Sequence, residues 1–401
     1  MVNNDAPVII IGSGLAGLAC ALTLKQRQQA FLLLDKASEA GGRLKSTYTK
    51  DGYLLDCGFQ VLLTSYPELK HFVDLKALEL QNFNSGALIY TPDKMRLLAN
   101  PLIHPSQIVN ETLSDLVSIK DKSLVVKLIF NLHTGNFIES TKLSTLSFLQ
   151  NFGFSQDFIE IFWRPFCAGV FLDKNLEVDS DYFRFLLKSF SSGRVAVPKN
   201  GMQEIPRQMC SKIHESEIRL GVDIKEISAQ GVVLASGEKI KAKSVVCAFN
   251  PIFDPNSLNF RSVINYYFST EEAIDWQKWL VLIPPQYKFH INNIAVMSQV
   301  SESYSKSGNH LLSVSLVGSE DPGEAIVAKE LMQIAKRDLK LKLIKKYKIE
   351  KALPKFYTKE TTLVKNGIYY CGDYLSSPSI NGALRSGRLT AGKLLTSYER
   401  E

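Results

Sequence analysis

Six residues near the N-terminus have the types and the spacing of a phosphate-binding turn. The run Gly12-Ser13-Gly14-Leu15-Ala16-Gly17 follows an unbroken apolar stretch at residues 8–11 and opens an apolar helical repeat over 15–24. In such a unit the first glycine permits a tight turn, the second lets backbone approach a pyrophosphate, and the third lets helix and strand pack closely. The helix N-terminus adds free N–H groups and the positive end of its dipole. The spacing therefore predicts a site for the phosphates of a dinucleotide.

A carboxylate stands where the second strand of this βαβ unit should end. Asp35 and Lys36 follow the apolar run at 31–34, and Asp35 lies 23 residues after Gly12. A carboxylate in that position accepts hydrogen bonds from both ribose hydroxyls, and it favours a ribose without a 2′-phosphate. The alternative, an accidental glycine turn in a core helix, requires all these features to fall in register by chance.

Two further glycine segments follow the βαβ unit. Gly41-Gly42-Arg43-Leu44 is a second glycine turn, and its guanidinium can neutralise a pyrophosphate. The apolar run at 54–63 has the composition of a strand, and Gly58 interrupts it just before Phe59 and Gln60. A glycine inside a strand often marks the close approach of a ligand or of another backbone. Both segments are therefore candidates for contact with the same ligand.

These motifs together resemble the FAD-binding signature of the flavin amine oxidase superfamily, which includes amine oxidases, protoporphyrinogen oxidases and phytoene or ζ-carotene desaturases. The resemblance extends over essentially the full chain. It implies an α/β fold with a Rossmann-like FAD-binding domain of the two-dinucleotide-binding-domain flavoprotein type, and a mixed α+β substrate domain with an inserted helical lobe. The implied FAD-binding domain takes residues 1–75, 195–255 and 356–401, and the substrate domain takes 76–194 and 256–355.

A second cofactor segment is expected near the C-terminus. A strand that starts at Gly367 ends in Gly372-Asp373, and a helix of small residues begins at Ile380-Asn381-Gly382-Ala383. Small residues let backbone amides approach a flat ring, and a helix N-terminus stabilises negative charge on the pyrimidine edge of a reduced flavin. Asp373 is expected to accept a hydrogen bond from a ribityl hydroxyl.

The residues expected to contact FAD lie in these segments and in a strand pair after position 218, where backbone near Ile224 would meet the adenine. An ordinary extension of an α/β sheet is the alternative for that strand pair. The expected contacts are Gly12, Ser13, Gly14, Leu15, Ala16, Gly17, Asp35, Lys36, Gly41, Gly42, Arg43, Leu44, Gly58, Phe59, Gln60, Ile224, Gly372, Asp373, Ile380, Asn381, Gly382 and Ala383.

The C-terminal motif is closer to the carotenoid desaturases than to the amine oxidases, in an unassigned branch of the superfamily. Amine oxidases place an aromatic residue two positions before the Glu of their Glu-Gly-Ala, whereas this chain has Ser379 and Asn381 at those positions. Half of the aromatic cage expected around an amine is therefore missing. Asn200 is another departure, because it replaces the first glycine of the family's Pro-x-Gly-Gly-Met stretch.

Residues 75–191 have helical periodicity with many Phe and Leu and few glycines, which predicts the inserted helical lobe. Arg164 stands there among the bulky apolar residues of 163–171. It either gives an apolar substrate wall one polar handle, or belongs to a helix end at which it snorkels to solvent or pairs with an acid. The sequence identifies no catalytic acid, base or nucleophile, and Gln60, Arg164 and Ser379 are the candidates for lining the substrate cavity.

Residues 256–355 predict the floor of the substrate domain. Their pattern indicates mostly antiparallel strands at 263–268, 279–283, 294–300 and 311–317, and a helix at 323–337. The formal net charge of the chain is +7, and between Lys329 and Lys355 ten basic residues against three acids account for all of it. A solvated helix face followed by a strand is the common cause of such a segment. An acidic partner or an anionic membrane surface is the alternative.

The remaining composition excludes several classes of protein. The six cysteines form no Cys-x-x-Cys pair and the six histidines are dispersed, so we expect a reducing compartment and no metal site. No secretory signal and no apolar run of about 18 residues is visible, which predicts a cytoplasmic protein, with peripheral membrane contact as an open alternative. No nucleic-acid-binding module is recognisable.

The resemblance implies an FAD-dependent oxidoreductase of the oxidase, desaturase or dehydrogenase type. It would transfer a hydride from a C–C or C–N bond of an apolar, carotenoid- or polyene-like small molecule to flavin N5. An amine or protoporphyrinogen oxidase is one alternative. A flavin-binding protein without turnover is the other.

Overall fold

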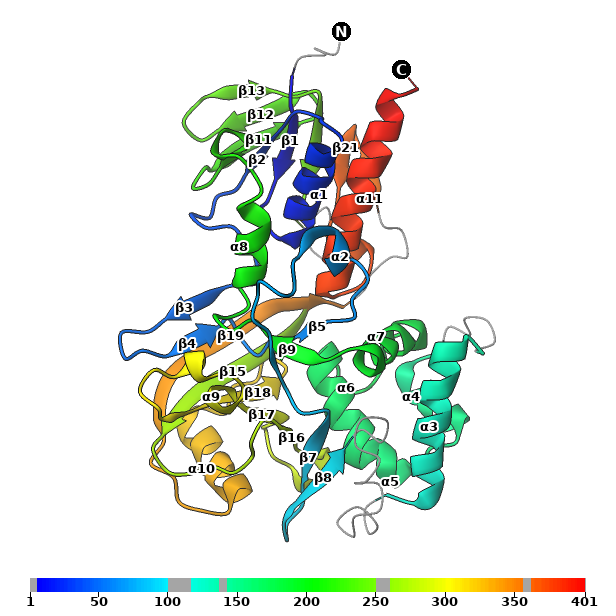
Figure 1. Ribbon diagram of the computed structural model, residues 1–401, viewed down its shortest axis with the longest axis vertical. Coiled ribbons are helices and arrows are strands. Elements are labelled where there is room, and N and C mark those ends of the chain that lie inside the picture. The colour runs from blue at the N-terminus through cyan, green and yellow to red at the C-terminus, as the bar shows by residue number, and fades with distance from the viewer. Residues whose placement is uncertain (1–5, 100–116, 137–142, 250–259, 356–361, 401) are drawn as a thin grey trace.

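The computed structural model describes residues 6–99, 117–136, 143–249, 260–355 and 362–400 (Figure 1). Two large sheets and a group of helices are its main parts. In Figure 1 the first sheet lies at the top together with both chain termini, the second sheet lies at the lower left, and the group of helices lies at the lower right.

The first sheet is a doubly wound sheet of six strands. Their order is β10 (Ile218–Arg219), β2 (Phe31–Leu34), β1 (Val8–Ile11), β14 (Ser244–Cys247), β21 (Ile368–Tyr370) and β20 (Leu363–Lys365). The first five strands are parallel, and β20 pairs antiparallel with β21. The chain leaves β1 toward β2 on one side and later returns to β14 on the other. In sheets of this kind the ligand binds beyond the carboxyl ends of the strands at such a switch point.

Both faces of the first sheet are covered, which explains its unbroken apolar strands. Val8 and Ile10 belong to the same core as helix α1 (Leu15–Gln26), whereas Ile9 and Ile11 pack with a separate three-stranded sheet. That small antiparallel sheet consists of β11 (Ile224–Ser228), β12 (Gly231–Leu234) and β13 (Lys239–Lys241).

Helix α11 (Ile380–Tyr398) lies along α1, as Figure 1 shows. Gly387 permits this contact, because a β-carbon there would lie 2.0 Å from the carbonyl oxygen of Ala16. The N-terminal and C-terminal segments of the chain are thereby brought to one end of the first sheet.

The second sheet has seven strands, all antiparallel except for the pair β16 and β7. In spatial order they are β19 (Lys342–Pro354), β15 (Phe260–Thr270), β18 (His310–Val317), β17 (Asn293–Val296), β16 (Leu280–Leu282), β7 (Gly86–Tyr90) and β8 (Met95–Ala99). Helix α10 (Glu324–Ala335) covers one face through Val327, Leu331 and Ile334. The lysine-rich segment after α10 is the edge strand β19, and exposed lysines protect a sheet edge from pairing with another chain.

The group of helices at the lower right, called here the helical lobe, spans 119–192. It contains α3 (Ile119–Thr134), α4 (Thr145–Phe152), α5 (Gln156–Phe158), a π-helical turn (Ile159–Trp163), α6 (Arg164–Phe171) and α7 (Ser180–Ser192). Its interior is aromatic: Trp163 is in ring contact with Phe154, Phe158 and Phe183.

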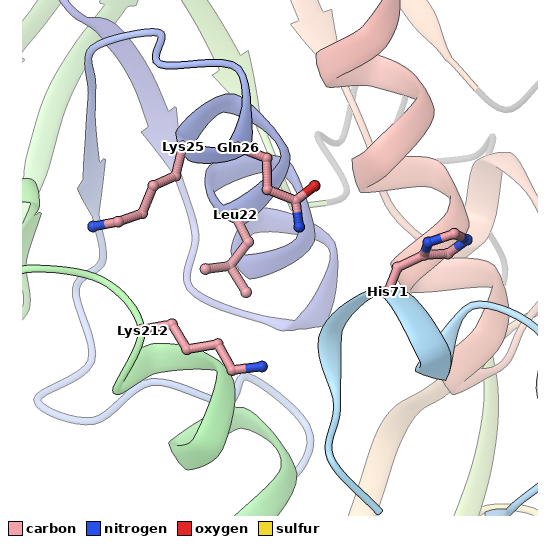
Figure 2. Close-up of a pocket in the computed structure, with 5 residues that line it drawn as sticks. All are labelled: Leu22, Lys25, Gln26, His71 and Lys212. Carbon is pink, nitrogen blue, oxygen red and sulfur yellow. The ribbon is translucent and has the colours of Figure 1, made fainter.

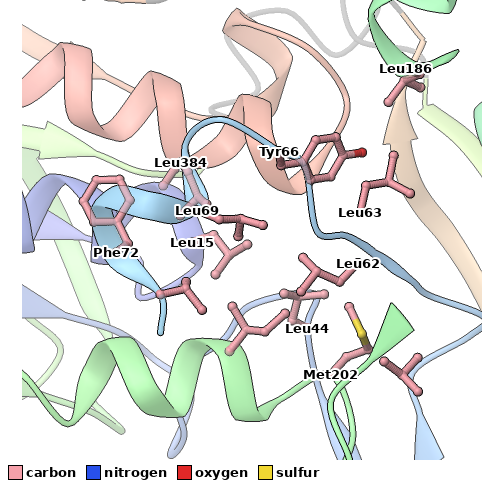
Figure 3. Close-up of a cluster of buried hydrophobic side chains, with 14 of the residues drawn as sticks. Leu15, Leu44, Leu62, Leu63, Tyr66, Leu69, Phe72, Leu186, Met202 and Leu384 are labelled. Carbon is pink, nitrogen blue, oxygen red and sulfur yellow. The ribbon is translucent and has the colours of Figure 1, made fainter. Parts of the chain in front are cut away.

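Short elements connect the two sheets. They are β3 (Ser46–Tyr48) with β4 (Leu54–Asp56), the three strands β5 (Leu62–Leu63), β9 (Val195–Val197) and β6 (Gln81–Asn82), and helices α2 (Leu69–Phe72), α8 (Glu204–Cys210) and α9 (Met297–Val300). Figure 3 shows how they join the first sheet, since Leu62, Leu69 and Met202 converge on Leu15 of α1 and Leu384 of α11.

Three expectations about secondary structure are wrong. The stretch 75–191 is not helical from its start, because β6, β7 and β8 precede the helices. The first strand of the pair expected after position 218 divides into β10 and β11, which belong to different sheets and are separated by Gly221 at φ +70°. The strand expected at 294–300 ends at Val296, where α9 begins. The domain boundaries stay a prediction, and two of them, near 255 and 356, lie outside the described residues.

No helix within the described ranges combines the length and the apolar character needed to cross a membrane. In the same ranges, no three His, Cys, Asp or Glu side chains are grouped as metal ligands.

Candidate cofactor site

The two N-terminal glycine turns lie against each other at the carboxyl end of β1. The Gly41 amide donates to the carbonyl oxygen of Ser13 (3.0 Å), and a β-carbon on Gly42 would lie 3.1 Å from Cα of Gly14. Gly12 and Gly42 have φ values of +105° and +61°, which favour glycine. Segments 12–17 and 41–43 therefore form one continuous surface with backbone exposed to a ligand.

Gly17 is required by the start of α1. A β-carbon there would lie 1.8 Å from the carbonyl oxygen of Gly12, so no other residue fits without moving the turn. Gly14 is the N-cap and has no side chain to bond the first amides of the helix. Those amides and the helix dipole are the features that hold a phosphate.

Asp35 ties the end of β2 to the first glycine turn. Its Oδ2 accepts from the amide and from the hydroxyl of Ser13, both at 2.6 Å, and its Oδ1 accepts from the Ala37 amide at 2.8 Å. A carboxylate has about four acceptor positions, so one stays open. The Ser13 hydroxyl can release a second, and together they match the two hydroxyls of an unmodified ribose. Lys36 follows directly.

The segment around Ile224 reaches the same place. The Asp35 amide donates to the Arg219 carbonyl oxygen (3.1 Å), and the Val222 amide donates to the Asp35 carbonyl oxygen (2.9 Å). Ile224 is two residues beyond Val222 and therefore lies near Asp35 in space. Its contact with adenine stays a prediction.

Arg43 and Asp373 form an ion pair although they lie 330 positions apart in the chain. Arg43 Nη2 is 2.6 Å from Asp373 Oδ1, and Arg43 Nη1 donates to the Ala352 carbonyl oxygen at 2.8 Å. The Asp373 carboxylate raises the pKa of Arg43. The Asp373 side chain is only 9% exposed, whereas that of Arg43 is 47% exposed. The residues expected at the pyrophosphate and at the ribityl chain thus meet at one point.

The start of α11 is built tightly around glycine. A β-carbon on Gly382 would lie 2.0 Å from the Ser377 carbonyl oxygen. The Ser379 hydroxyl caps the helix by accepting from the Gly382 amide (3.0 Å), and the Gly372 amide donates to Ser386 Oγ (3.0 Å). Ser379 was expected to line the substrate cavity. Its hydroxyl instead completes the helix terminus, and its role toward a substrate stays a prediction.

Asn381 directs its side chain toward α2. Its Oδ1 accepts from the Glu68 amide (3.1 Å), and the Glu68 carboxylate accepts two bonds from Arg388 (2.7 and 2.8 Å). The pKa of Arg388 is raised by its hydrogen bonds to Glu68. These contacts, which we call the Glu68 clamp, fix the first and third turns of α11 against α2. The Ala383 amide already donates to the Ser379 carbonyl oxygen (3.0 Å), so the backbone amides of Ile380 and Asn381, in the first turn of α11, are the ones that stay for the flavin.

Gln60 lies next to the second glycine turn. Its Nε2 donates to the carbonyl oxygens of Arg43 (3.1 Å) and Cys57 (3.2 Å), whereas its Oε1 is buried and bonds to none of the described residues. Gly58, at φ +84°, accepts at its carbonyl from the Tyr267 hydroxyl (3.2 Å). A buried acceptor that lacks a donor fits a bound molecule that carries N–H or O–H groups.

Arg164 has protein partners at three of its donors. Its Nε and Nη2 donate to the Glu160 carboxylate (2.6 and 2.8 Å), and its Nη1 donates to the Lys174 carbonyl oxygen (2.7 Å). Of the two interpretations that the sequence left open, the structure contains the pairing with an acid at a helix end. A role as a polar handle for substrate stays a prediction.

Asp56 is a buried polar residue that the sequence reasoning missed. Its carboxylate accepts from Ser46 Oγ (2.5 Å), from the Met202 amide (2.9 Å) and from the Tyr304 hydroxyl (2.5 Å). Burial raises its pKa above the ordinary value even against these bonds. Asp56 connects the β3–β4 hairpin, the start of α8 and the region of the second sheet. The only acid within the apolar run 54–63 was the available signal.

A line of half-buried aromatic side chains separates the helical lobe from the second sheet. Phe162 stacks on Phe166 (5.5 Å between ring centres), and Phe166 contacts Phe190 (5.2 Å). Phe162 and Phe166 also pack against the cluster of Ala87, Ile89 and Leu282 in the second sheet. Beside them, Trp163 Nε1 is buried and makes no hydrogen bond to a described residue. We call Phe162, Phe166 and Phe190 the aromatic wall.

One cavity of about 250 Å³ lies at the opposite end of α1 from the glycine turn (Figure 2). It is lined by Leu22, Lys25, Gln26, His71 and Lys212. Lys25 is paired with Glu217 (2.6 Å), and Lys212 donates to the Phe72 carbonyl oxygen (2.6 Å). Because its lysines already have partners and it adjoins the negative end of the helix dipole, this cavity is no part of the phosphate site.

Comparison with known proteins identifies a family whose model matches most of the chain. A family model described as flavin containing amine oxidoreductase matches residues 15–357. An "Inactive all-trans-retinol 13,14-reductase" of Danio rerio is 24% identical over 61% of this chain and 47% of its own length. A "4,4'-diapolycopene oxygenase" of Methylomonas sp is 38% identical over 15% of this chain and 12% of its own length. The chain therefore spans less than half the length of either curated relative.

A solved structure of putrescine oxidase bound to putrescine has the same fold. It superposes with a TM-score of 0.68 at 14% identity and covers 98% of this chain and 99% of its own. At this identity the likeness is one of fold alone.

Proposed function

We propose that this chain, which belongs to the flavin containing amine oxidoreductase family, oxidises an apolar substrate with conjugated double bonds by means of FAD. Membership in the family confirms the predicted superfamily, the α/β fold, the FAD cofactor and the assignment as an oxidoreductase. The substrate class is the proposed part.

The described residues fit FAD along its whole length. Asp35 and the segment near Ile224 would hold the AMP half, and the backbone of Gly14, Gly42 and the start of α1 would hold the pyrophosphate together with Arg43. Asp373 and the start of α11 would hold the ribityl chain and the pyrimidine edge. FAD, when bound, supplies the hydride acceptor for the oxidation.

The observation that carries the proposal is the aromatic wall. Phe162, Phe166 and Phe190 are half-buried and uncharged, and Phe162 and Phe166 pack between the helical lobe and the second sheet. Arg164, the guanidinium of α6, is already neutralised by Glu160. An apolar, flat molecule is what such a surface binds best.

The helical lobe also touches the flavin end of the cofactor site. Tyr182 of α7 donates to the carbonyl oxygen of Pro378 (2.8 Å), two residues before the start of α11. A substrate that lies along the aromatic wall is therefore near the segment expected at the flavin. The names of both curated relatives refer to polyenes, which agrees with this substrate class.

Amine oxidation is the second candidate, favoured by the fold shared with putrescine oxidase. The start of α11 argues against it, since Ser379 caps the helix and Asn381 contacts Glu68 at the positions where amine oxidases have the aromatic residue and the Glu.

Anaerobic reduction of the flavin discriminates between these substrates. The purified protein would be mixed with all-trans-retinol, with linear carotenes in detergent and with putrescine, and the oxidised flavin absorbance would be followed. Bleaching by a polyene alone supports the proposal. Bleaching by putrescine alone would replace it with amine oxidation, and no bleaching by any of the three while dithionite still reduces the flavin would leave a flavin-binding protein without turnover.

A further inference from the structure

Helix α3 presents an apolar stripe to solvent. Ile119, Val126 and Phe130 are 85%, 44% and 61% exposed, and they are three of the eight large hydrophobic side chains that are exposed among the described residues. At about 100° per residue, positions 119, 126 and 130 fall within a sector about 40° wide. The helix therefore has one narrow apolar face that the other described residues leave uncovered.

Lysines border this stripe on both sides. On the same helical projection, Lys120 and Lys127 lie to one side of it and Lys122 to the other. The only acid of α3, Asp121, is 1% exposed and turned inward, where it accepts from the amide and the hydroxyl of Ser155. The outer side of α3 is thus apolar along its centre, and the lysines along its edges are the charged residues that it exposes.

The helix is held rigidly in this orientation. Its inner residues Leu128 and Leu132 are buried in the same core as Trp163. Ser118 caps its N-terminus, and Gly135 ends it in the left-handed conformation. The stripe is therefore a fixed surface of the helical lobe.

We propose that α3 docks this chain on an anionic lipid bilayer. Ile119, Val126 and Phe130 would enter the boundary between headgroups and acyl chains, while the flanking lysines extend to the lipid phosphates. A second copy of the chain is a poorer occupant, because pairing α3 with α3 brings three lysines against three, and the one acid of α3, Asp121, is buried. An acidic bilayer satisfies both the apolar centre and the basic edges.

The position of α3 in the helical lobe suggests what docking would achieve, and this step rests on the proposed function. Helix α3 packs against α7, and α7 contributes Phe183 to the ring cluster around Trp163. A bilayer-bound α3 therefore sets the lobe that carries the aromatic wall beside the membrane, where apolar polyenes dissolve. Docking itself needs neither FAD nor turnover, so its test is separate from that of the substrate.

Vesicle co-sedimentation tests the docking with the full chain. The probes are vesicles of phosphatidylcholine alone and of phosphatidylcholine with phosphatidylserine. We expect binding to the mixed vesicles, a loss of about tenfold or more for Phe130→Ser, and a loss of about fivefold per lysine for Lys120→Gln, Lys122→Gln and Lys127→Gln. The flavin spectrum and the thermal unfolding midpoint should not change in these surface variants.

Two matched controls distinguish binding through α3 from nonspecific adsorption of exposed apolar or basic side chains to the vesicles. Ile326→Ser removes an exposed isoleucine from α10, and a triple change of Lys345, Lys348 and Lys351 to Gln removes the same charge from β19. Both should retain vesicle binding. The proposal is overturned if the wild-type protein does not bind mixed vesicles, or if the triple β19 variant loses as much binding as the α3 variants in which lysine is replaced. It is also overturned if Phe130→Ser dissociates a dimer while vesicle binding persists.

Discussion

Substitution of Arg43 by Ala should weaken FAD binding by about 10-fold to 150-fold. A hydrogen bond from a guanidinium to a phosphate contributes about 1.5–3 kcal/mol, and each 1.4 kcal/mol is about tenfold in affinity. Without FAD the same substitution should lower the free energy of unfolding by about 1–3 kcal/mol, because the buried Asp373 carboxylate loses its partner. The effect on FAD affinity is therefore measured separately from the effect on the fold.

Titration of the flavin-free protein with FAD, followed by flavin fluorescence, gives the affinity. Riboflavin serves as a second ligand, since it lacks the pyrophosphate and its affinity should not depend on Arg43. Arg43→Lys should recover part of the loss because it restores the charge without the bidentate geometry. The control is Arg207→Ala on α8, which removes a side chain of similar exposure (51%) that pairs with Glu204.

Two results would show that Arg43 does not bind the pyrophosphate. One is an unchanged FAD affinity in Arg43→Ala. The other is an equal loss for FAD and riboflavin, which would mean that the substitution disturbs the flavin end through Asp373 and leaves the pyrophosphate contact unaffected.

The remaining predictions concern the glycine turn, the Glu68 clamp and the buried acid. Gly17→Ala should abolish FAD binding because its β-carbon meets the Gly12 carbonyl, whereas Gly392→Ala, in open space on α11, should keep FAD and raise the free energy of unfolding by about 0.5–1 kcal/mol. Glu68→Gln should lower the free energy of unfolding by about 2 kcal/mol in denaturant titrations, because the buried side of its pair with Arg388 loses its charge. Burial raises the pKa of Asp56, so the folded chain holds a proton that the unfolded chain releases near the ordinary value of 3.8. Stability should therefore fall as the pH rises from that value through the folded pKa. Thermal unfolding of Asp56→Asn should lack that decline, and an identical pH profile in both proteins would contradict it.

The local parts of the fold were predictable from the sequence. Strands β1 and β2, with α1 between them, lie where the apolar runs and the glycine spacing placed them, because a strand buried on both faces must be apolar throughout and a phosphate turn requires glycine. The short strands were not predictable in the same way. Two-residue strands such as β6 and β10 have no periodicity of their own and exist because a neighbouring strand offers hydrogen bonds.

In the candidate site, too, local motifs were predictable from the sequence and long-range contacts were not. The glycine segments could be identified as separate motifs, and the contact of Gly14 with Gly42 follows from their shared role. The pairing of Arg43 with Asp373 and the use of Asn381 to hold Glu68 depend on how α11 packs on α1 and α2, which no local pattern contains. Arg164 illustrates the limit, since an arginine among aromatic residues has the same sequence context whether it faces an acid or a substrate.

The most direct test of the central claim is to identify what the purified protein holds and what reduces it. We expect one FAD per chain by mass spectrometry and absorbance, the loss of that FAD in Gly17→Ala, and anaerobic bleaching by a polyene but not by an amine. A chain that folds but neither retains nor takes up FAD, or one whose flavin is reduced by amines and not by polyenes, would contradict it.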